Sequence, residues 1–260
     1  MEFFYRCSEC DREFDITPDL MLCPHCRERH EQGLPLRGVL EVRMRGIPSA
    51  PPAIDARAGV PAGAAGHSGA EPWWASILPV ERSWFPSIPF DNTPLWEPAG
   101  LRRELGLPNL YLKDDTGLPT GSLKDRASAL VAAFARKHGR ESVVVASTGN
   151  AACSMAGVGA AAGLAVTIFV PGSAPRAKLI QSLQYGATVQ VIDGTYDEAY
   201  QASLRFVLDD GCMCRNTGYN PMTIEGKKTV ILEVFSQLGR VPDAVFVPTG
   251  DGAIVGGGYK

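Results

Sequence analysis

The sequence predicts an α/β protein, with parallel strands between two layers of helices, preceded by a small cysteine-bearing unit. Three observations predict this fold class. From residue 123 onward, short β-branched runs alternate with longer helical ones, as in βαβ units. The 260 residues are 45% apolar and 20% charged, which is enough for a substantial core. A segment rich in Pro, Ala and Gly separates the two parts.

The first part, residues 1–45, carries two Cys-x-x-Cys pairs separated by twelve residues. Two such pairs bring four thiolates to the corners of a tetrahedron, the geometry of a structural zinc site. His25 or His30 could replace one thiolate, and a degenerate ribbon that holds no metal is the alternative. A closed four-thiolate site leaves no position for substrate, so its role would be structural. The expected ligands are Cys7, Cys10, Cys23 and Cys26.

Residues 46–72 are interpreted as a linker, because a composition so rich in Pro, Ala and Gly cannot bury a face. The aromatic, proline-punctuated stretch that follows predicts an extended segment packed on a domain surface. Within residues 73–260, we expect 123–216 to form a small α/β domain. Residues 73–122 and 217–260 would then belong to an incomplete large domain.

Helices and strands alternate through the second part of the chain. Runs such as "SVVVAS" and "AVTIFV" are short and β-branched, and the segments between them have the length of helices. This alternation is typical of βαβ units with a parallel sheet. The predicted helices are 123–138, 151–162, 175–185, 195–209 and 224–238, and the predicted strands are 142–147, 165–170, 188–193, 212–216 and 244–249.

Composition argues against several classes of protein. The formal net charge is -3 and no block of Lys or Arg occurs, so neither a nucleic-acid nor a membrane-surface partner is indicated. No run approaches the roughly 18 apolar residues of a membrane span, and the start lacks the order of a signal peptide. The seven cysteines are an odd number, which suits a reducing compartment. We therefore expect a cytoplasmic protein with a small-molecule substrate.

Lys124 stands where a helix begins, directly after the turn "LPTGS". A helix start is positive and disfavours a lysine there, so the residue requires a reason. A lysine amine becomes a catalyst by forming a Schiff base with a carbonyl, and pyridoxal phosphate is the commonest cofactor held in this way. A solvated surface lysine is the alternative.

Two loops follow predicted strands, where ligands of α/β sheets bind. The stretch "VVVASTGNAACSMAG" places Ser147, Thr148, Gly149 and Asn150 between a strand and a helix, and its small hydroxyls and backbone N–H groups suit a substrate carboxylate. The stretch "VFVPTGDGAIVGGG" is a second glycine-rich turn. By itself such a turn also serves ordinary turn chemistry.

Together these stretches resemble threonine synthases, a branch of the fold type II pyridoxal phosphate enzymes related to tryptophan synthase β. The resemblance rests on "DNTPL", "LYLKDDTGLPTGSLKDRAS", "ASTGNAACS", "GTYDEA", "NPMTIEGKKT" and "VPTGDG", in that order, and on the "VP…P…K…Q…YGA" series, and it spans residues 90–260. The cysteine pairs look like the zinc-ribbon segment of many prokaryotic members. The resemblance implies that O-phospho-L-homoserine and water are converted to L-threonine and phosphate, with a homodimer as a possible assembly.

The resemblance also implies roles for individual residues. Lys124 would be the Schiff-base lysine and the general base and acid, and Asn150 would hydrogen-bond the phenolic oxygen of the cofactor. The substrate carboxylate would lie against Ser147, Thr148, Gly149 and Ala151. The cofactor phosphate would lie at Gly250, Asp251, Gly252 and Ala253.

Two positions depart from the family pattern. The phosphate loop of the family more often reads G-N-x-G-N, and a carboxylate at Asp251 is unfavourable beside a phosphate unless its side chain turns away. Thr223 stands where many members have an arginine, which weakens the case for a phosphorylated substrate. The cations that could replace this arginine are Arg176, Lys178 and Lys228.

Other functions remain open at this stage. The same lysine and carboxylate loop would serve a serine or threonine ammonia-lyase, or a β-replacement enzyme similar to cysteate synthase. A non-catalytic zinc-ribbon binding protein is the alternative from another class. The chain stops at "GDGAIVGGGYK", whereas the family continues further and supplies the partner of the pyridine nitrogen, so we expect a truncated chain that is poorly soluble and catalytically silent alone.

Overall fold

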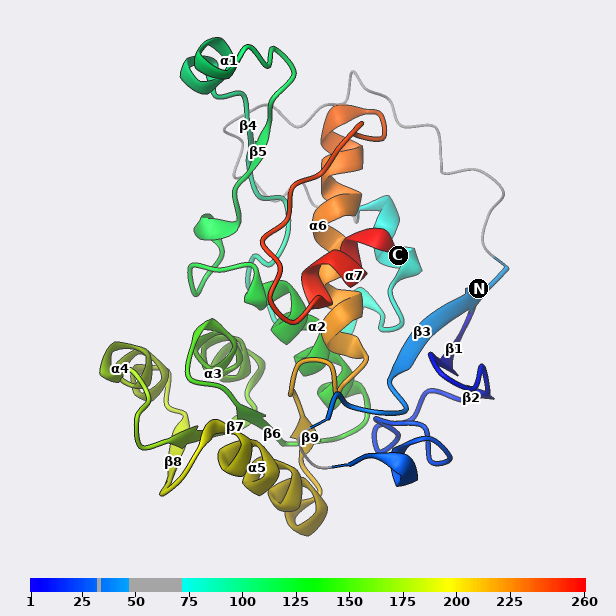
Figure 1. The fold of residues 1–260 in the computed structure, drawn as a ribbon, viewed down its shortest axis with the longest axis vertical. Coiled ribbons are helices and arrows are strands. Elements are labelled where there is room, and N and C mark those ends of the chain that lie inside the picture. Colours follow the sequence, from blue (N-terminus) through cyan, green and yellow to red (C-terminus); the bar gives the residue numbers. More distant parts are fainter. Residues whose placement is uncertain (32–33, 47–71) are drawn as a thin grey trace.

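The computed structural model describes residues 1–31, 34–46 and 72–260, and Figure 1 shows their arrangement. Apart from its two end residues, the expected linker at 46–72 lies outside the described residues. In the part that the structure describes, no helix combines the length and the apolar character that crossing a membrane requires.

The N-terminal unit is a small antiparallel sheet. Its strands are β1 (Glu2–Cys7), β2 (Glu13–Phe14) and β3 (Leu40–Arg45), in the order β2-β1-β3. Tyr5, Leu40 and Val42 point into the core and join the same buried cluster as Trp74 and Leu130 of the second part. The cysteine-bearing unit therefore packs on the main body of the protein.

The aromatic segment after residue 72 has little regular structure. It forms two short 3-10 helices, η3 (Trp73–Ile77) and η4 (Arg82–Trp84), with buried Trp74 and Phe85 anchoring it to the core. A two-stranded hairpin follows, β4 (Leu95–Trp96) with β5 (Leu112–Lys113), joined through α1 (Ala99–Leu105) and followed by η5 (Asp115–Gly117).

A four-stranded parallel sheet forms the centre of the second part. Its strands are β6 (Ser142–Ala146), β7 (Ala165–Pro171), β8 (Thr188–Ile192) and β9 (Met213–Cys214), in the order β8-β7-β6-β9. Every pairing is parallel, as in the register Val145↔Ile168. The predicted parallel α/β fold is confirmed.

Helices cover both faces of this sheet, because alternate residues of β6 point to opposite sides. Val143 and Val145 join the cluster that contains Met155 of α3 (Asn150–Ala162), whereas Val144 and Ala146 join the cluster that contains α5 (Tyr196–Asp210). α4 (Arg176–Gln184) packs beside α3. Three layers result, with α3 and α5 on opposite sides of the strands (Figure 1).

A second set of helices packs around α2 (Lys124–Lys137), which contacts both α3 and α6 (Met222–Leu238). Gly226 makes the contact with α6 close: a Cβ there would lie 2.5 Å from the backbone oxygen of Arg126. The last helix, α7 (Ala253–Tyr259), packs on α6. The start of α2 is thereby held between the sheet and α6.

One predicted element is wrong. The run "AVFVPT" at 244–249 is β-branched and apolar, but it is not a strand in the structure. Val245 and Phe246 are 55% and 94% exposed. A strand exists through its hydrogen bonds to a neighbour, and among the described residues none lies alongside this run. The other predicted helices and strands are present, although β9 has only two residues of the predicted 212–216.

Candidate active site

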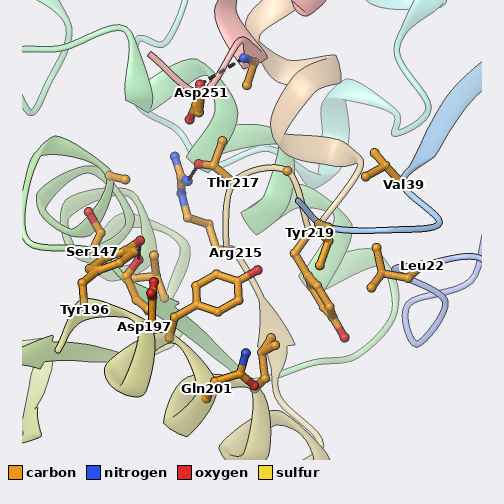
Figure 2. A pocket seen from close by; sticks show the side chains of 18 of the residues that line it. Leu22, Val39, Ser147, Tyr196, Asp197, Gln201, Arg215, Thr217, Tyr219 and Asp251 are labelled. Atoms are coloured by element: carbon orange, nitrogen blue, oxygen red, sulfur yellow. Dashed lines mark hydrogen bonds between the residues drawn. The ribbon is translucent and has the colours of Figure 1, made fainter. Parts of the chain in front are cut away.

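A cavity of about 1680 Å³ opens at the carboxyl ends of β6 and β9 (Figure 2). It is lined by the starts of α2, α3 and α5, by the loop before α7 and by part of the cysteine-bearing unit. Thr148, Gly149 and Gly250 are not among the lining residues, although each adjoins one that is. The predicted site residues that do line it are Lys124, Ser147, Asn150, Ala151, Asp251, Gly252 and Ala253.

Lys124 is positioned by the turn that precedes it. The N–H of Gly121 donates to the carbonyl of Leu118 at 2.8 Å, and Gly121 has the positive φ of 77° that glycine adopts readily. The buried carboxylate of Asp125 accepts from the backbone N–H of Thr120 at 2.8 Å. These bonds fix the turn, so the first residue of α2 is held at the cavity wall.

The surroundings of Lys124 favour a neutral amine. Burial lowers the pKa of Lys124 below its ordinary value, and the charge of Arg215 lowers it further, whereas Asp251 opposes the shift. Within the described part of the chain, the Lys124 amine has no hydrogen-bond partner. A partly buried, deprotonated amine is the form in which lysine acts as a nucleophile.

The loop between β6 and α3 is ordered by its own contacts. The N–H of Gly149 donates to Oγ of Ser147 at 3.2 Å, and the hydroxyl of Tyr196 donates to the carbonyl of Ala146 at 3.1 Å. Figure 2 shows Tyr196 beside Ser147 on one side of the cavity. Tyr196 lies in the motif "GTYDEA", but no role was assigned to it from the sequence, because it belongs to α5 and follows Ser147 by almost fifty residues.

Asp251 lies at the opposite side of the cavity, in the loop that precedes α7 (Figure 2). Its Oδ1 accepts from the backbone N–H of Ala253 at 3.0 Å, and Gly252 has a φ of 75°. The side chain thus takes a backbone donor that an incoming phosphate would otherwise use. Its negative charge is opposed by the nearby cations Lys124 and Arg215.

Arg215, directly after β9, is a cavity residue that sequence reasoning missed. It is fully buried, and its Nη1 donates to Oγ1 of Thr217 at 2.8 Å. The available signal was an arginine directly after the apolar run "CMC". Its burial could not be foreseen, because it depends on the packing of α2 and α5 around the end of β9.

The cations considered earlier as substitutes for an arginine at 223 do not line the cavity. Lys228 is buried and pairs with Glu225 at 2.6 Å, while also donating to the carbonyl of Ile77. Arg176 and Lys178 belong to α4, beyond the cavity. Thr223 is fully buried and its hydroxyl donates to the carbonyl of Asn220.

The four cysteines of the N-terminal unit come together. Their sulfur atoms all lie within 4.8 Å of one another, with Cys7 and Cys26 at 3.8 Å and Cys10 and Cys23 at 3.7 Å. Four thiolates around one zinc ion at about 2.3 Å would be about 3.8 Å apart, so the arrangement fits a metal. Neither His25 nor His30 belongs to the cluster, and His30 lines the cavity instead.

The chain is similar to pyridoxal-phosphate dependent enzymes and, among them, to several threonine synthases. Residues 87–260 match the family described as "Pyridoxal-phosphate dependent enzyme". The threonine synthase of Bacillus sp. (strain ULM1) is 36% identical over 180 residues, which cover 68% of this chain and 51% of that protein. The threonine synthase of Methanosarcina acetivorans is 35% identical over 72% of this chain and 46% of its own length. The chain spans about half the length of the curated relatives it matches.

Solved structures of related enzymes show the same fold. Maize serine racemase superimposes with a TM-score of 0.58 at 26% identity, covering 64% of this chain and 50% of the racemase. Threonine deaminase isoform 2 from Solanum lycopersicum gives a TM-score of 0.57 at 29% identity, covering 64% of this chain and 45% of its own.

Proposed function

Because the chain belongs to the pyridoxal-phosphate dependent enzymes, we propose that it catalyses a reaction of the threonine synthase type. The substrate would be O-phospho-L-homoserine, which reacts with water to give L-threonine and phosphate. The observation that carries this proposal is the position of Lys124, whose amine meets the cavity beside the predicted carboxylate loop. The similarity to proteins named threonine synthase supports it.

The residues of the cavity fit the cofactor. The Lys124 amine is without a hydrogen-bond partner among the described residues and its pKa is lowered, as attachment to an aldehyde requires. Asn150, at the first position of α3, would hydrogen-bond the phenolic oxygen. The loop from Gly250 to Ala253 would hold the phosphate. The hydrogen bond between Asp251 and the N–H of Ala253 would then break, so that this N–H could donate to the phosphate.

The chain's own residues would share the work of the reaction. When bound, pyridoxal phosphate supplies an electron sink for the charge left at a substrate carbon that loses a proton. Lys124 would remove and return protons at the substrate carbons. Its pKa is lowered toward neutral pH, where a general acid and base works best. Ser147, Thr148, Gly149 and Ala151 would fix the substrate carboxylate by hydroxyl and backbone donors. The four cysteines would hold a structural zinc ion.

The test uses the natural protein expressed from its complete gene and loaded with cofactor. Borohydride reduction followed by peptide mapping is expected to find the pyridoxyl group on Lys124. O-phosphohomoserine, serine and threonine are supplied in parallel, and release of phosphate and of ammonia is measured. Lys124→Ala is expected to abolish turnover, whereas Lys178→Ala, in α4 and not among the residues that line the cavity, serves as the matched control. Ammonia from serine without phosphate from O-phosphohomoserine would assign an ammonia-lyase instead.

A further inference from the structure

Two arginines are fully buried among the described residues, and their surroundings differ. Arg126 forms ion pairs with Asp115 at 2.8 Å and Glu233 at 2.6 Å. Arg215 has no ion pair with any carboxylate of the described residues. A buried charge is costly unless it is paired, and Arg215 has the charge of Asp251 nearby but no carboxylate in contact, unlike Arg126.

The contacts of Arg215 are neutral and incomplete. Its Nη1 donates to the hydroxyl of Thr217 at 2.8 Å and its Nε to the hydroxyl of Ser128 at 3.3 Å. Its Nη2 is shielded from solvent and has no hydrogen-bond partner in the described part of the chain. Figure 2 shows the guanidinium beside Thr217 and below Asp251. Although burial lowers the pKa of Arg215 to about 10, the group remains charged at neutral pH.

A second basic side chain without a hydrogen-bond partner among the described residues lies on α6. Lys227 is fully buried, and its amine has no hydrogen-bond partner among the described residues. Burial and the charges of Arg215 and Lys124 lower its pKa to about 7. Its neighbour in the sequence, Lys228, is fully paired with Glu225 and the carbonyl of Ile77. An anion bound next to Arg215 would raise the pKa of Lys227 and so favour its charged form.

From this geometry we propose that Arg215, supported by Lys227, is the site that binds the terminal anionic group of the substrate, a phosphate monoester or a group of the same shape and charge. The inference rests on the proposed function for the identity of the substrate, and it assigns its recognition to residues outside the family motif. A guanidinium offers a planar pair of donors that suits phosphate oxygens. Thr223 stands where many family members have an arginine, but it is buried and its hydroxyl donates to the carbonyl of Asn220. We therefore assign the recognition of this anion to Arg215.

The hydrogen bonds of Arg215 distinguish it from the donors proposed for the two other anions in the reaction. The predicted carboxylate donors belong to the loop at Ser147, after β6, and the predicted donors for the cofactor phosphate belong to the loop at Asp251. Arg215 follows β9 and contacts neither loop by a hydrogen bond, since its partners are Thr217 and Ser128. It therefore offers a third anion site in the same cavity.

The experiment compares two probes that differ only in the terminal anion. 2-Amino-5-phosphonopentanoate has the length of O-phosphohomoserine, with a phosphonate that cannot leave, and norvaline is the same amino acid without it. Binding of each to the cofactor-loaded natural protein is measured by isothermal titration calorimetry, which does not depend on turnover. We expect the unchanged protein to prefer the phosphonate by at least tenfold. Equal affinity for the two probes would overturn the proposal before any variant is made.

Variants then assign the preference. Arg215→Gln is expected to weaken phosphonate binding about 10- to 100-fold, the loss typical of a hydrogen bond to a charged group, and to change norvaline binding less than threefold. Arg215→Lys, which keeps the charge and is more certain to fold, is expected to lose about tenfold. The control is Arg205→Gln, which removes a charge from an exposed residue at the rim of the same cavity.

Three outcomes of the variants are decisive. Equal weakening of both probes would overturn the proposal, because Arg215 would then contact the part that they share. Weakened retention of pyridoxal phosphate, with phosphonate binding unchanged, would overturn it in favour of the cofactor phosphate. Phosphonate binding that depends on Arg215 in a protein that releases no phosphate from O-phosphohomoserine would confirm the site and reject the proposed reaction.

Discussion

Glu233 on α6 is a buried carboxylate that pairs with two cations, Arg126 and Lys113. It pairs with Arg126 at 2.6 Å and with Lys113 at 2.7 Å, and it accepts from the backbone N–H of Asn92 at 2.9 Å. Burial alone would raise the pKa of Glu233, but the charges and hydrogen bonds of Arg126 and Lys113 outweigh it and lower the pKa to about 2. The folded state thus depends on this carboxylate being ionised.

Glu233→Gln is expected to lower the free energy of unfolding at neutral pH by about 3–5 kcal/mol, because it leaves the half-buried Lys113 without its anion and the buried Arg126 with Asp115 alone. The effect must depend on pH. The folded pKa of Glu233 is depressed below its ordinary 4.5, so its contribution is present above about pH 4.5 and is lost as the pH falls toward 2. Urea denaturation from pH 7 to pH 2 measures this.

In the Gln variant, the fall in stability between pH 4.5 and 2 is expected to be shallower than in the unchanged protein. The control is Glu104→Gln, at an exposed position of α1, which is expected to change the free energy of unfolding by less than about 0.5 kcal/mol. Equal slopes in all three proteins would show that Glu233 is not the titrating group.

At the scale of single residues, the sequence predicted the groups that a motif carries and missed those that only tertiary contacts assemble. Lys124, Ser147 and Asn150 stand in local strand-to-helix or turn-to-helix contexts, and the structure places all three in one cavity. The local sequence around Arg215 and Tyr196 does not show that these side chains reach the cavity. Arg215 reaches the cavity because β9 pairs with β6, and Tyr196 reaches it because α5 packs on one face of the sheet.

Among the elements, the contact between α2 and α6 depends on the absence of a side chain. A Cβ at Gly226 would lie 2.5 Å from the carbonyl oxygen of Arg126 and 2.8 Å from the Cα of Ala127, and backbone atoms cannot move aside cheaply. Gly226→Ala is expected to lower the free energy of unfolding by about 1–3 kcal/mol or more through overpacking. Urea denaturation with α-helical circular dichroism measures it.

Gly256→Ala is the matched control for Gly226→Ala. It lies within α7, and a Cβ there would meet only the Ile224 side chain at 4.0 Å, an ordinary contact. Since alanine favours a helix over glycine, this variant is expected to be neutral or slightly more stable. A Gly226→Ala protein as stable as the control would mean that the two helices can separate without cost.

The alternation of elements could be predicted from the sequence because each βαβ unit is encoded locally. α3, for example, was expected at 151–162 and runs from Asn150 to Ala162. The strand expected at 244–249 failed because a β-branched composition shows only that a segment can pair. Whether a neighbour lies beside it is a property of the assembled sheet, as the exposed Phe246 shows.

Over the whole molecule, the cysteine-bearing unit shares a core with the rest. Cys7, Cys23 and Leu40 belong to the same buried cluster as Trp74 of the second part, and His30 and Val39 line the cavity. The linker composition separates the two parts along the sequence, but composition cannot reveal whether they pack together. The metal site is therefore expected to stabilise the protein as a whole.

Cys10→Ser tests this coupling in the natural protein. We expect about one zinc per chain in the unchanged protein, a loss of most of it in the variant, and a lower urea midpoint when the fluorescence of tryptophans such as the buried Trp74 is followed. The control is Cys212→Ser, a buried cysteine outside the cluster. Zinc well below one per chain in the unchanged protein would reject the metal site, and an unchanged midpoint in Cys10→Ser would reject the coupling.

The packing of α2 against α6 also has a consequence for folding during synthesis on the ribosome. Glu233 follows Arg126 by 107 residues, and at about 5–20 residues per second it is added on the order of 5–20 s later. The sheet and its helices can form in this interval. During the same interval the apolar face of α2 has no α6 to pack against, and Arg126 lacks its ion pair with Glu233. A chaperone that binds nascent chains would find α2 exposed during that interval, and slowed translation of the intervening segment would lengthen the exposure.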